Sequence, residues 1–153
     1  MNKVRINPTA TEREAQALDL WDRLAPDRDR WIDRYSFFHG HDQRYMKFLI
    51  PEGLRVLELG CGTGRLLDAL KPSRGVGIDL SPKMIEIAAR NYPDLEFHAG
   101  NIEHADTLRG VKGPFDIIVL SDTIGFLDDC ESTLAALHQL CQPDTRIVIA
   151  YHN

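Results

Sequence analysis

Three glycines stand at alternate positions after an acidic residue in the segment 56–64. Glu58 lies near the end of an apolar run, and Gly60, Gly62 and Gly64 then precede a helical pattern. Because glycine has no Cβ atom, such a backbone lets a ligand approach closely and adopts the φ angles of a tight turn. The residues therefore predict a ligand-binding turn between a buried strand and the N-terminus of a helix.

A second acidic residue, Asp79, ends the next apolar run of the sequence. It follows the glycines by about twenty residues, the distance at which nucleotide-binding βαβ units place a ribose-binding carboxylate. Hydrogen bonds from ribose hydroxyls to a carboxylate are strong because the acceptor is charged. The alternative is that Asp79 caps the helix predicted after Ser81 and Pro82.

The spacing of the glycines distinguishes two classes of cofactor. A dinucleotide-binding loop reads G-x-G-x-x-G or G-x-G-x-x-A, and its third small position is occupied here by Arg65. The third glycine comes one place earlier, at Gly64. The pattern E-x-G-x-G-x-G resembles motif I of the class I S-adenosylmethionine-dependent methyltransferases. The resemblance covers residues 55–153 well and the first fifty residues loosely.

The resemblance implies S-adenosylmethionine as cofactor and gives roles to residues at the strand ends. Asp79 would bind the ribose, and Asn101 would meet the adenine amino group, where the family often has Asp. Glu58 would order the loop or hold the cofactor's ammonium group. Three apolar side chains would enclose the adenine: Leu80, Met84 and Ile102. The complete predicted cofactor site is Tyr35, Glu58, Gly60, Cys61, Gly62, Gly64, Asp79, Leu80, Met84, Asn101, Ile102 and Ser121.

Several residues at the predicted strand ends also have structural interpretations. Asn101 can form a turn after Gly100, and Asp122 can cap a helix. Leu80 and Ile102 can be ordinary core residues. Many relatives carry a histidine pair after the fourth strand, where this chain has Ile124-Gly125-Phe126-Leu127. The catalytic residue is therefore left unassigned.

An aromatic segment with two histidines, residues 35–41, precedes the sheet. It resembles a segment before motif I in some bacterial small-molecule methyltransferases, whose N-terminal helices cover the cofactor as a lid. Tyr35 or His39 would then contact the methionine tail or the acceptor, and the alternative is a packed or solvent-facing side chain. No carboxylate or cysteine pattern completes a metal site with His39 and His41, so no metal is predicted.

Two kinds of periodicity divide the chain. Residues 1–50 show helical spacing and are predicted to form an N-terminal cap or lid. Residues 51–153 alternate strands with helices and predict a Rossmann-like S-adenosylmethionine-binding α/β domain, with a parallel sheet of order 3-2-1-4-5 and helices on both faces. The predicted strands are 55–59, 76–80, 95–99, 115–120 and 146–151. The family sheet normally has seven strands, and the final hairpin strands are not predicted here. The domain is therefore expected to be incomplete at its C-terminus, and the alternative is that a partner completes the sheet edge.

Composition narrows the class of partner. The 153 residues are 43% apolar and 27% charged, with a formal net charge of −5. The negative charge and the lack of a basic stripe argue against nucleic acid as the main partner. No apolar run approaches the ~20 residues of a membrane span. Three cysteines without a C-x-x-C pair indicate a reducing compartment, so a cytoplasmic location is expected.

These observations predict an enzyme that transfers a methyl group from S-adenosylmethionine to a small-molecule or glycan-type acceptor by in-line displacement. The sulfonium is already activated, so the protein mainly positions the reactants and excludes water. The alternative is a non-catalytic module of the same fold that senses the cofactor or binds a partner. Strand 146–151 is apolar and lies at the predicted sheet edge, which makes a homodimer through this strand a further expectation.

Overall fold

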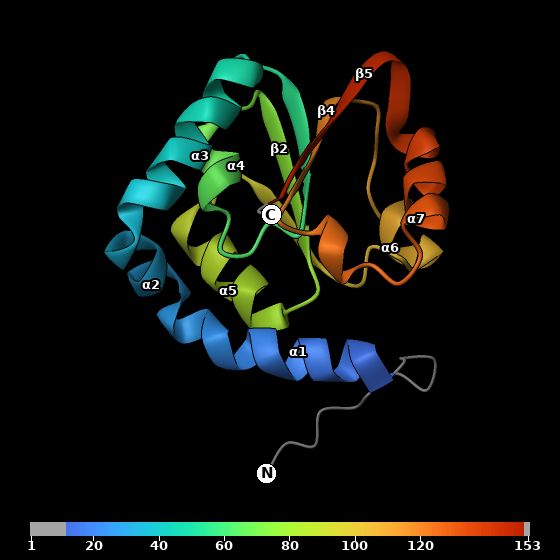
Figure 1. The fold of residues 1–153 in the computed structure, drawn as a ribbon. Coiled ribbons are helices and arrows are strands. Elements are labelled where there is room, and N and C mark those ends of the chain that lie inside the picture. The colour runs from blue at the N-terminus through green and yellow to red at the C-terminus, as the bar shows by residue number, and fades with distance from the viewer. Residues whose placement is uncertain (1–11, 152–153) are drawn as a thin grey trace.

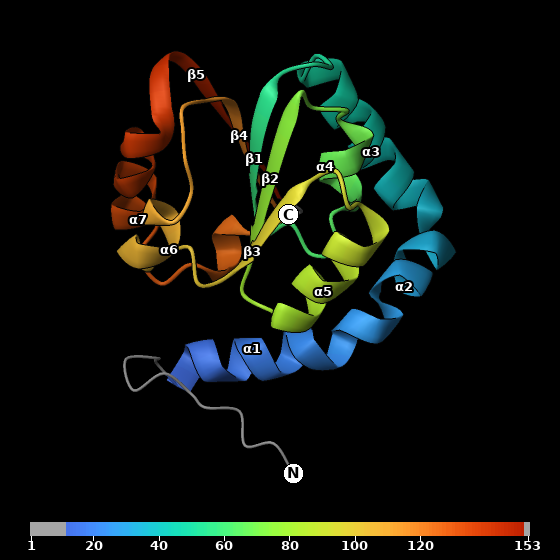
Figure 2. The same cartoon turned by 180° about the vertical axis from the view of Figure 1, so that it is seen from behind.

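The computed structural model describes residues 12–151 and consists of a parallel β-sheet between two layers of helices (Figures 1 and 2). The strands are β1 (Arg55–Leu59), β2 (Arg74–Asp79), β3 (Glu96–Ala99), β4 (Phe115–Ser121) and β5 (Cys141–Ala150). The α-helices are α1 (Glu12–Leu24), α2 (Arg28–Arg34), α3 (Ser36–Leu49), α4 (Arg65–Ala69), α5 (Pro82–Asn91), α6 (Ala105–Arg109) and α7 (Cys130–Ala136). Short 3-10 turns are η1 (Ala25–Asp27), η2 (Ile124–Phe126) and η3 (Leu137–Leu140).

The strand order is β3-β2-β1-β4-β5, and every neighbouring pair is parallel. This order and the Rossmann-like fold class confirm the prediction. Strand β5 begins at Cys141, five residues earlier than expected from the apolar run that starts at Arg146. Thr145 holds the polar first half against β4, because its hydroxyl donates to the carbonyl of Phe115 at 2.6 Å and accepts from the N–H of Gln142 at 2.8 Å.

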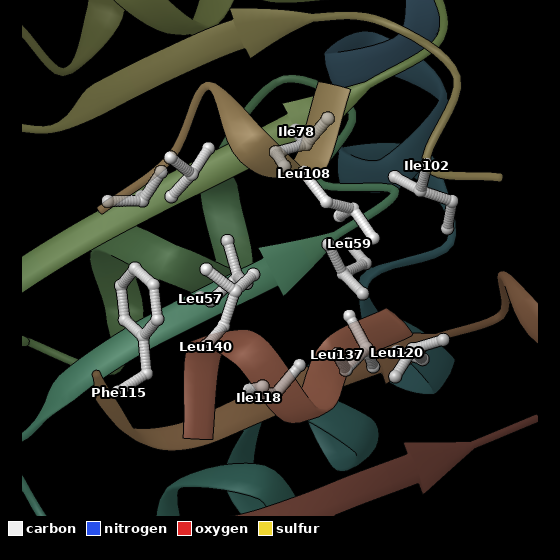
Figure 3. Packing of buried hydrophobic residues seen from close by; sticks show 12 residues of the cluster. Leu57, Leu59, Ile78, Ile102, Leu108, Phe115, Ile118, Leu120, Leu137 and Leu140 are labelled. Atoms are coloured by element: carbon white, nitrogen blue, oxygen red, sulfur yellow. The ribbon is translucent and has the colours of Figure 1, made fainter. Parts of the chain in front are cut away.

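Buried apolar side chains form one cluster on each face of the sheet. Successive side chains of β4 point to opposite faces of the sheet. Ile118 and Leu120 therefore lie in one cluster, and Ile117 and Val119 lie in the other. The first cluster includes residues of α6 and η3 and is shown in Figure 3. The second includes residues of α3 and α4. Burial on both faces explains why β4 reads as a continuous apolar run.

The N-terminal helices wrap around one side of this core, and α1 lies across the end of the sheet beside the start of α5 (Figures 1 and 2). Helix α3 begins at Ser36, so the aromatic segment 35–41 is mostly helical. The rings of Phe37 and His41, one turn apart, lie 4.8 Å from each other and support this first part of the helix. Residues 1–11 of the predicted cap fall outside the described part of the chain.

Candidate functional site

The glycine loop after β1 has the backbone conformation that its sequence predicts. Gly60, Gly62 and Gly64 all have positive φ angles, of 76°, 53° and 81°. A Cβ atom at Gly60 would come within 2.1 Å of the hydroxyl of Thr123, so the loop packs closely against the segment after β4. At Gly62 a Cβ atom would meet nothing within 4 Å, and Gly62 lines a cavity. The loop is therefore tight at its start and open at its middle.

Asp79, at the end of β2, faces the same cavity and also orders the loop. One carboxylate oxygen accepts a hydrogen bond from the N–H of Gly62 at 2.8 Å, and the other accepts from the N–H of Ser81 at 2.9 Å. Ser81 itself caps α5, since its hydroxyl accepts from the N–H of Met84 at 3.1 Å. Burial raises the pKa of Asp79, while its two backbone hydrogen bonds and Arg28 lower it. Each oxygen keeps a further lone pair for a ligand.

Two hollows meet above the glycine loop at the carboxyl ends of the strands. The larger has a volume of about 360 Å³, and α1 closes it on one side with Ala17 and Trp21. The smaller, of about 280 Å³, extends toward α3. Predicted site residues that line the larger hollow are Gly60, Gly62, Asp79, Leu80, Met84, Asn101, Ile102 and Ser121. Those that line the smaller one are Glu58, Gly60, Cys61, Gly62 and Ser121.

Two predicted site residues lie away from both hollows. Tyr35 ends α2, and its ring packs back on Trp31 with the ring centres 4.9 Å apart. Trp31 and His39 line the larger hollow instead. Gly64 faces the ring of Phe97, which a Cβ atom would meet at 2.8 Å. Tyr35 and Gly64 each lie where a helix joins its neighbouring element, and their contact with a cofactor stays a prediction.

Asn101 serves in a turn and also lines the larger hollow. Its side-chain oxygen accepts a hydrogen bond from the N–H of Glu103 at 2.9 Å. Glu103 in turn accepts hydrogen bonds from the N–H groups of Asp128 and Asp129, each at 2.8 Å. This carboxylate ties the loop after β3 to the loop before α7. Asn101 therefore forms the turn that was its alternative role and also lies at the hollow where the cofactor site was predicted.

Glu58 is a buried carboxyl group with one unsatisfied oxygen. It is 3% exposed, and its Oε2 has no hydrogen-bond partner among the described residues. Burial and the nearby charge of Asp79 raise the pKa of Glu58 to about 8, against the opposing effect of a backbone hydrogen bond from Leu67. The group lines the smaller hollow, so it can meet a cationic ligand there.

Arg28, which the sequence analysis did not select, lines both hollows. Its guanidinium lies 5.4 Å from the centre of the Trp31 ring. Burial lowers the pKa of Arg28, and the charges of Asp122, Asp29 and Asp79 oppose this effect. Acids and bases alternate from Asp27 to Arg30, a pattern that is typical of a solvent-exposed helix face. Arg28 lies three residues before Trp31, and residues three apart share a helix face. This spacing predicts that both residues lie on the inner face of α2.

Asp122, directly after β4, also lines both hollows. It has a φ angle of 54°, which a residue with a Cβ atom rarely adopts. Its N–H donates to the carbonyl of Ala150 at 2.8 Å, so the end of β5 fixes this conformation. Backbone strain of this kind is concentrated at functional sites. Asp122 therefore joins Arg28 as a candidate site residue.

Between residues 12 and 151, no three His, Cys, Asp or Glu side chains are grouped as a metal site would require. Within the same range, no helix has the length and apolar character to cross a membrane.

The sheet order, the glycine loop after β1 and the acid at the end of β2 are typical of a Rossmann-like nucleotide-binding domain. Residues 10–153 match the family model described as "Methyltransferase domain", and the chain belongs to this family.

Among curated proteins the chain is 32% identical over 96 residues to malonyl-[acyl-carrier protein] O-methyltransferase of Halalkalibacterium halodurans, covering 58% of this chain and 35% of that protein. It is 29% identical over 102 residues to dTDP-4-amino-2,3,4,6-tetradeoxy-D-glucose N,N-dimethyltransferase of Saccharopolyspora spinosa, covering 65% and 38%. It is 25% identical over 156 residues to the ubiquinone/menaquinone biosynthesis C-methyltransferase of Campylobacter jejuni, covering 90% and 64%. The chain thus spans roughly one third to two thirds of these relatives.

Solved structures show the same fold. A SAM-dependent methyltransferase from Thermotoga maritima superposes with a TM-score of 0.71 at 25% identity, over 86% of this chain and 60% of that one. The DhpI-SAH complex superposes with a TM-score of 0.74 at 18% identity, over 91% and 69%. At that identity, the second similarity concerns the fold alone.

Proposed function

We propose that this domain binds S-adenosylmethionine and transfers its methyl group to a small-molecule acceptor, with a glycan-type acceptor as the finer expectation. The observation that carries the proposal is the position of Asp79. Its carboxylate is fixed by the N–H groups of Gly62 and Ser81 and lies in the wall of the 360 Å³ hollow. This is where a ribose would be bound in a fold of this kind.

The residues of the two hollows fit the different parts of the cofactor. Asp79 would accept from the ribose hydroxyls, and Asn101 with its apolar neighbours would hold the adenine. Glu58, with its unsatisfied oxygen, would face the ammonium group of the amino-acid tail. Arg28 would pair with the carboxylate of that tail, since guanidinium and carboxylate groups match in shape and charge. Gly62 leaves room for the tail to pass close to the backbone.

When bound, S-adenosylmethionine supplies a methyl group activated by a positively charged sulfur. The protein's contribution is then to orient the acceptor and to keep water away from the reacting atoms. Trp21 and Phe126 favour such exclusion, because they pack edge to face, with ring centres 5.5 Å apart, in the wall of the larger hollow. Asp122 lies where the hollows meet and would face the acceptor, and we assign no general base.

The names of two curated relatives, an amino-sugar and a quinone methyltransferase, support a small acceptor, but the named acceptors differ in chemistry. The curated relatives include an O-methyltransferase, an amino-sugar N,N-dimethyltransferase and a quinone C-methyltransferase. Similarity at 25–32% identity over part of each relative does not distinguish these acceptors. The acceptor class is therefore best determined by assay.

Calorimetry with S-adenosylhomocysteine and with NAD tests the cofactor. We expect binding of the first and none of the second, and the opposite result would overturn the proposal. Methyl transfer from labelled S-adenosylmethionine to amino-sugar, hydroxyl and quinol acceptors then tests the reaction. Binding without transfer to any acceptor would favour the alternative of a cofactor-sensing or partner-binding module.

A further inference from the structure

Asp22, on α1, contacts the turn that follows Asp79. Its carboxylate accepts a hydrogen bond from the hydroxyl of Ser81 at 2.5 Å, and Ser81 is completely buried. The N–H of Ser81 donates to Asp79, which also accepts from the N–H of Gly62. Hydrogen bonds therefore run without interruption from α1, through the turn after β2, to the glycine loop.

Asp29, on α2, makes a second contact of the same kind. Its carboxylate accepts a hydrogen bond from the hydroxyl of Thr63 at 2.6 Å, and Thr63 is only 3% exposed. Thr63 lies between the second and third glycines of the loop. The carboxylate also lies 3.9 Å from the guanidinium of Arg65 and accepts from the side-chain amide of Asn91 at 3.4 Å. Each of the two helices thus places one carboxylate on one loop of the proposed site.

Neither carboxylate lines a hollow, so neither would touch the cofactor or the acceptor. We propose that Asp22 and Asp29 are positioning residues, which couple docking of α1 and α2 to the order of the two loops that would hold the cofactor. This inference rests on the proposed function. If docked helices favour the ordered loops, bound cofactor must favour docked helices by the same factor. The docked cap and the formed site would then be one state of the molecule.

Calorimetry with S-adenosylhomocysteine tests the first contact. Asp22→Ala removes a hydrogen bond to a charged acceptor, so we expect the Kd to rise about tenfold. Asp22→Asn keeps an acceptor oxygen for Ser81, and its Kd should stay within about threefold of the parent value. Asp19→Ala is the matched control, because Asp19 is on the same helix and pairs with Arg23 at 3.0 Å on the exposed face. We expect this control to leave the Kd unchanged.

The second contact is tested in the same way and then combined with the first. Asp29→Ala should also raise the Kd about tenfold. Because both contacts hold the same cap, the double variant should lose less than the sum of the two single losses in free energy. Fully additive losses would show two separate local contacts and would overturn the coupling.

Hydrogen exchange distinguishes coupling from a purely structural role, because only coupling changes the protection that the ligand gives to the helices. In the parent chain, S-adenosylhomocysteine should slow exchange in residues 12–34, and Asp22→Ala should reduce this protection. A lower melting temperature in Asp22→Ala with an unchanged Kd and unchanged ligand protection would overturn the inference while leaving the proposed function intact. Failure of the parent chain to bind S-adenosylhomocysteine would remove the proposed function, and the inference with it.

Discussion

The carboxylate of Asp79 accepts a hydrogen bond from the backbone N–H of Gly62 at 2.8 Å, which joins the end of β2 to the middle of the glycine loop. The two predicted parts of the site are therefore in direct contact. Asp79, which was expected to bind ribose or to cap the helix after Ser81, also holds the glycine loop in shape. Its substitution should change both the ligand contact and the geometry around it.

We predict that Asp79→Ala weakens S-adenosylhomocysteine binding by roughly 1.5–3 kcal/mol, the scale of hydrogen bonds to a charged group. The fold should survive, because Asp79 lines a hollow and is not part of either apolar cluster. Asp79→Asn should also bind more weakly, since its amide NH₂ would oppose the N–H of Gly62 or Ser81. Calorimetry and thermal melting check this prediction, with the exposed Asp106→Ala as control. An unchanged Kd would reduce Asp79 to a purely structural role.

The sequence predicted the strand-end residues well because the rule that places them is simple. Parallel strands end at one edge of the sheet, so Gly60, Asp79, Asn101 and Ser121 must lie together once the strands are recognised. The structure brings all four to the larger hollow. Their positions required no knowledge of side-chain packing.

The N-terminal helices were harder to predict in detail. Helical spacing shows which residues share a face, but it does not show which loop that face will contact. Arg28 lines the hollows, and Asp22 and Asp29 contact the loops beside them, across sequence separations that no local pattern encodes. Tyr35 was expected at the site because the segment 35–41 resembles one that precedes motif I in some small-molecule methyltransferases. In the structure it ends α2 and packs on Trp31, and its contact with a cofactor stays a prediction.

The raised pKa of Glu58 makes a prediction about stability and pH. The pKa is about 8 in the folded protein and has an ordinary value of 4.5. Between these values the folded chain binds more protons than the unfolded chain, so stability should fall as pH rises from 4.5 toward 8. Glu58→Gln removes this titration. We expect its melting temperature to exceed that of the parent at pH 8 and to match it near pH 4.5. The same difference at both pH values would contradict the assignment.

Glu58 also predicts a proton release on ligand binding. If the ammonium group of S-adenosylhomocysteine lies beside Glu58, it should favour the ionised carboxylate and lower its pKa. Below pH 8, binding should then expel a proton, and affinity should rise as pH increases toward that value. Calorimetry in buffers of different ionisation enthalpy measures the proton directly. The Glu58→Gln variant should release no proton on binding. A binding enthalpy that is independent of buffer in the parent chain would place the ammonium group elsewhere.

Arg28 is predicted to recognise the amino-acid tail of the cofactor. Arg28→Ala should weaken S-adenosylhomocysteine binding by about 1.5–3 kcal/mol, because a charged hydrogen-bond donor is lost. Adenosine, which has no tail, should bind the parent and the variant equally. Arg30→Ala is the matched control, since Arg30 pairs with Asp27 at 2.8 Å on the exposed side of the same region. Equal losses for adenosine and S-adenosylhomocysteine would show that Arg28 supports the whole site and not the tail.

Strand β5 is predicted to mediate self-association. It lies at the edge of the sheet, so its outer backbone groups lack a neighbouring strand in the described chain. Ile147 and Ile149 on this strand are each 41% exposed, which adds apolar surface beside the open edge. We expect the chain to form dimers as its concentration increases, with light scattering and sedimentation as the measurements. Ile149→Lys should shift the equilibrium toward monomer, because a charge would then be buried at the contact.

Phe48→Lys distinguishes this edge from another exposed apolar surface. Phe48 lies on α3 and is 83% exposed, so it would be the centre of an alternative contact through that helix. If pairing runs through β5, Phe48→Lys should associate as the parent does, and Ile149→Lys should not. The reverse pattern would assign the contact to α3. A parent chain that stays monomeric at every concentration would contradict the predicted association through β5.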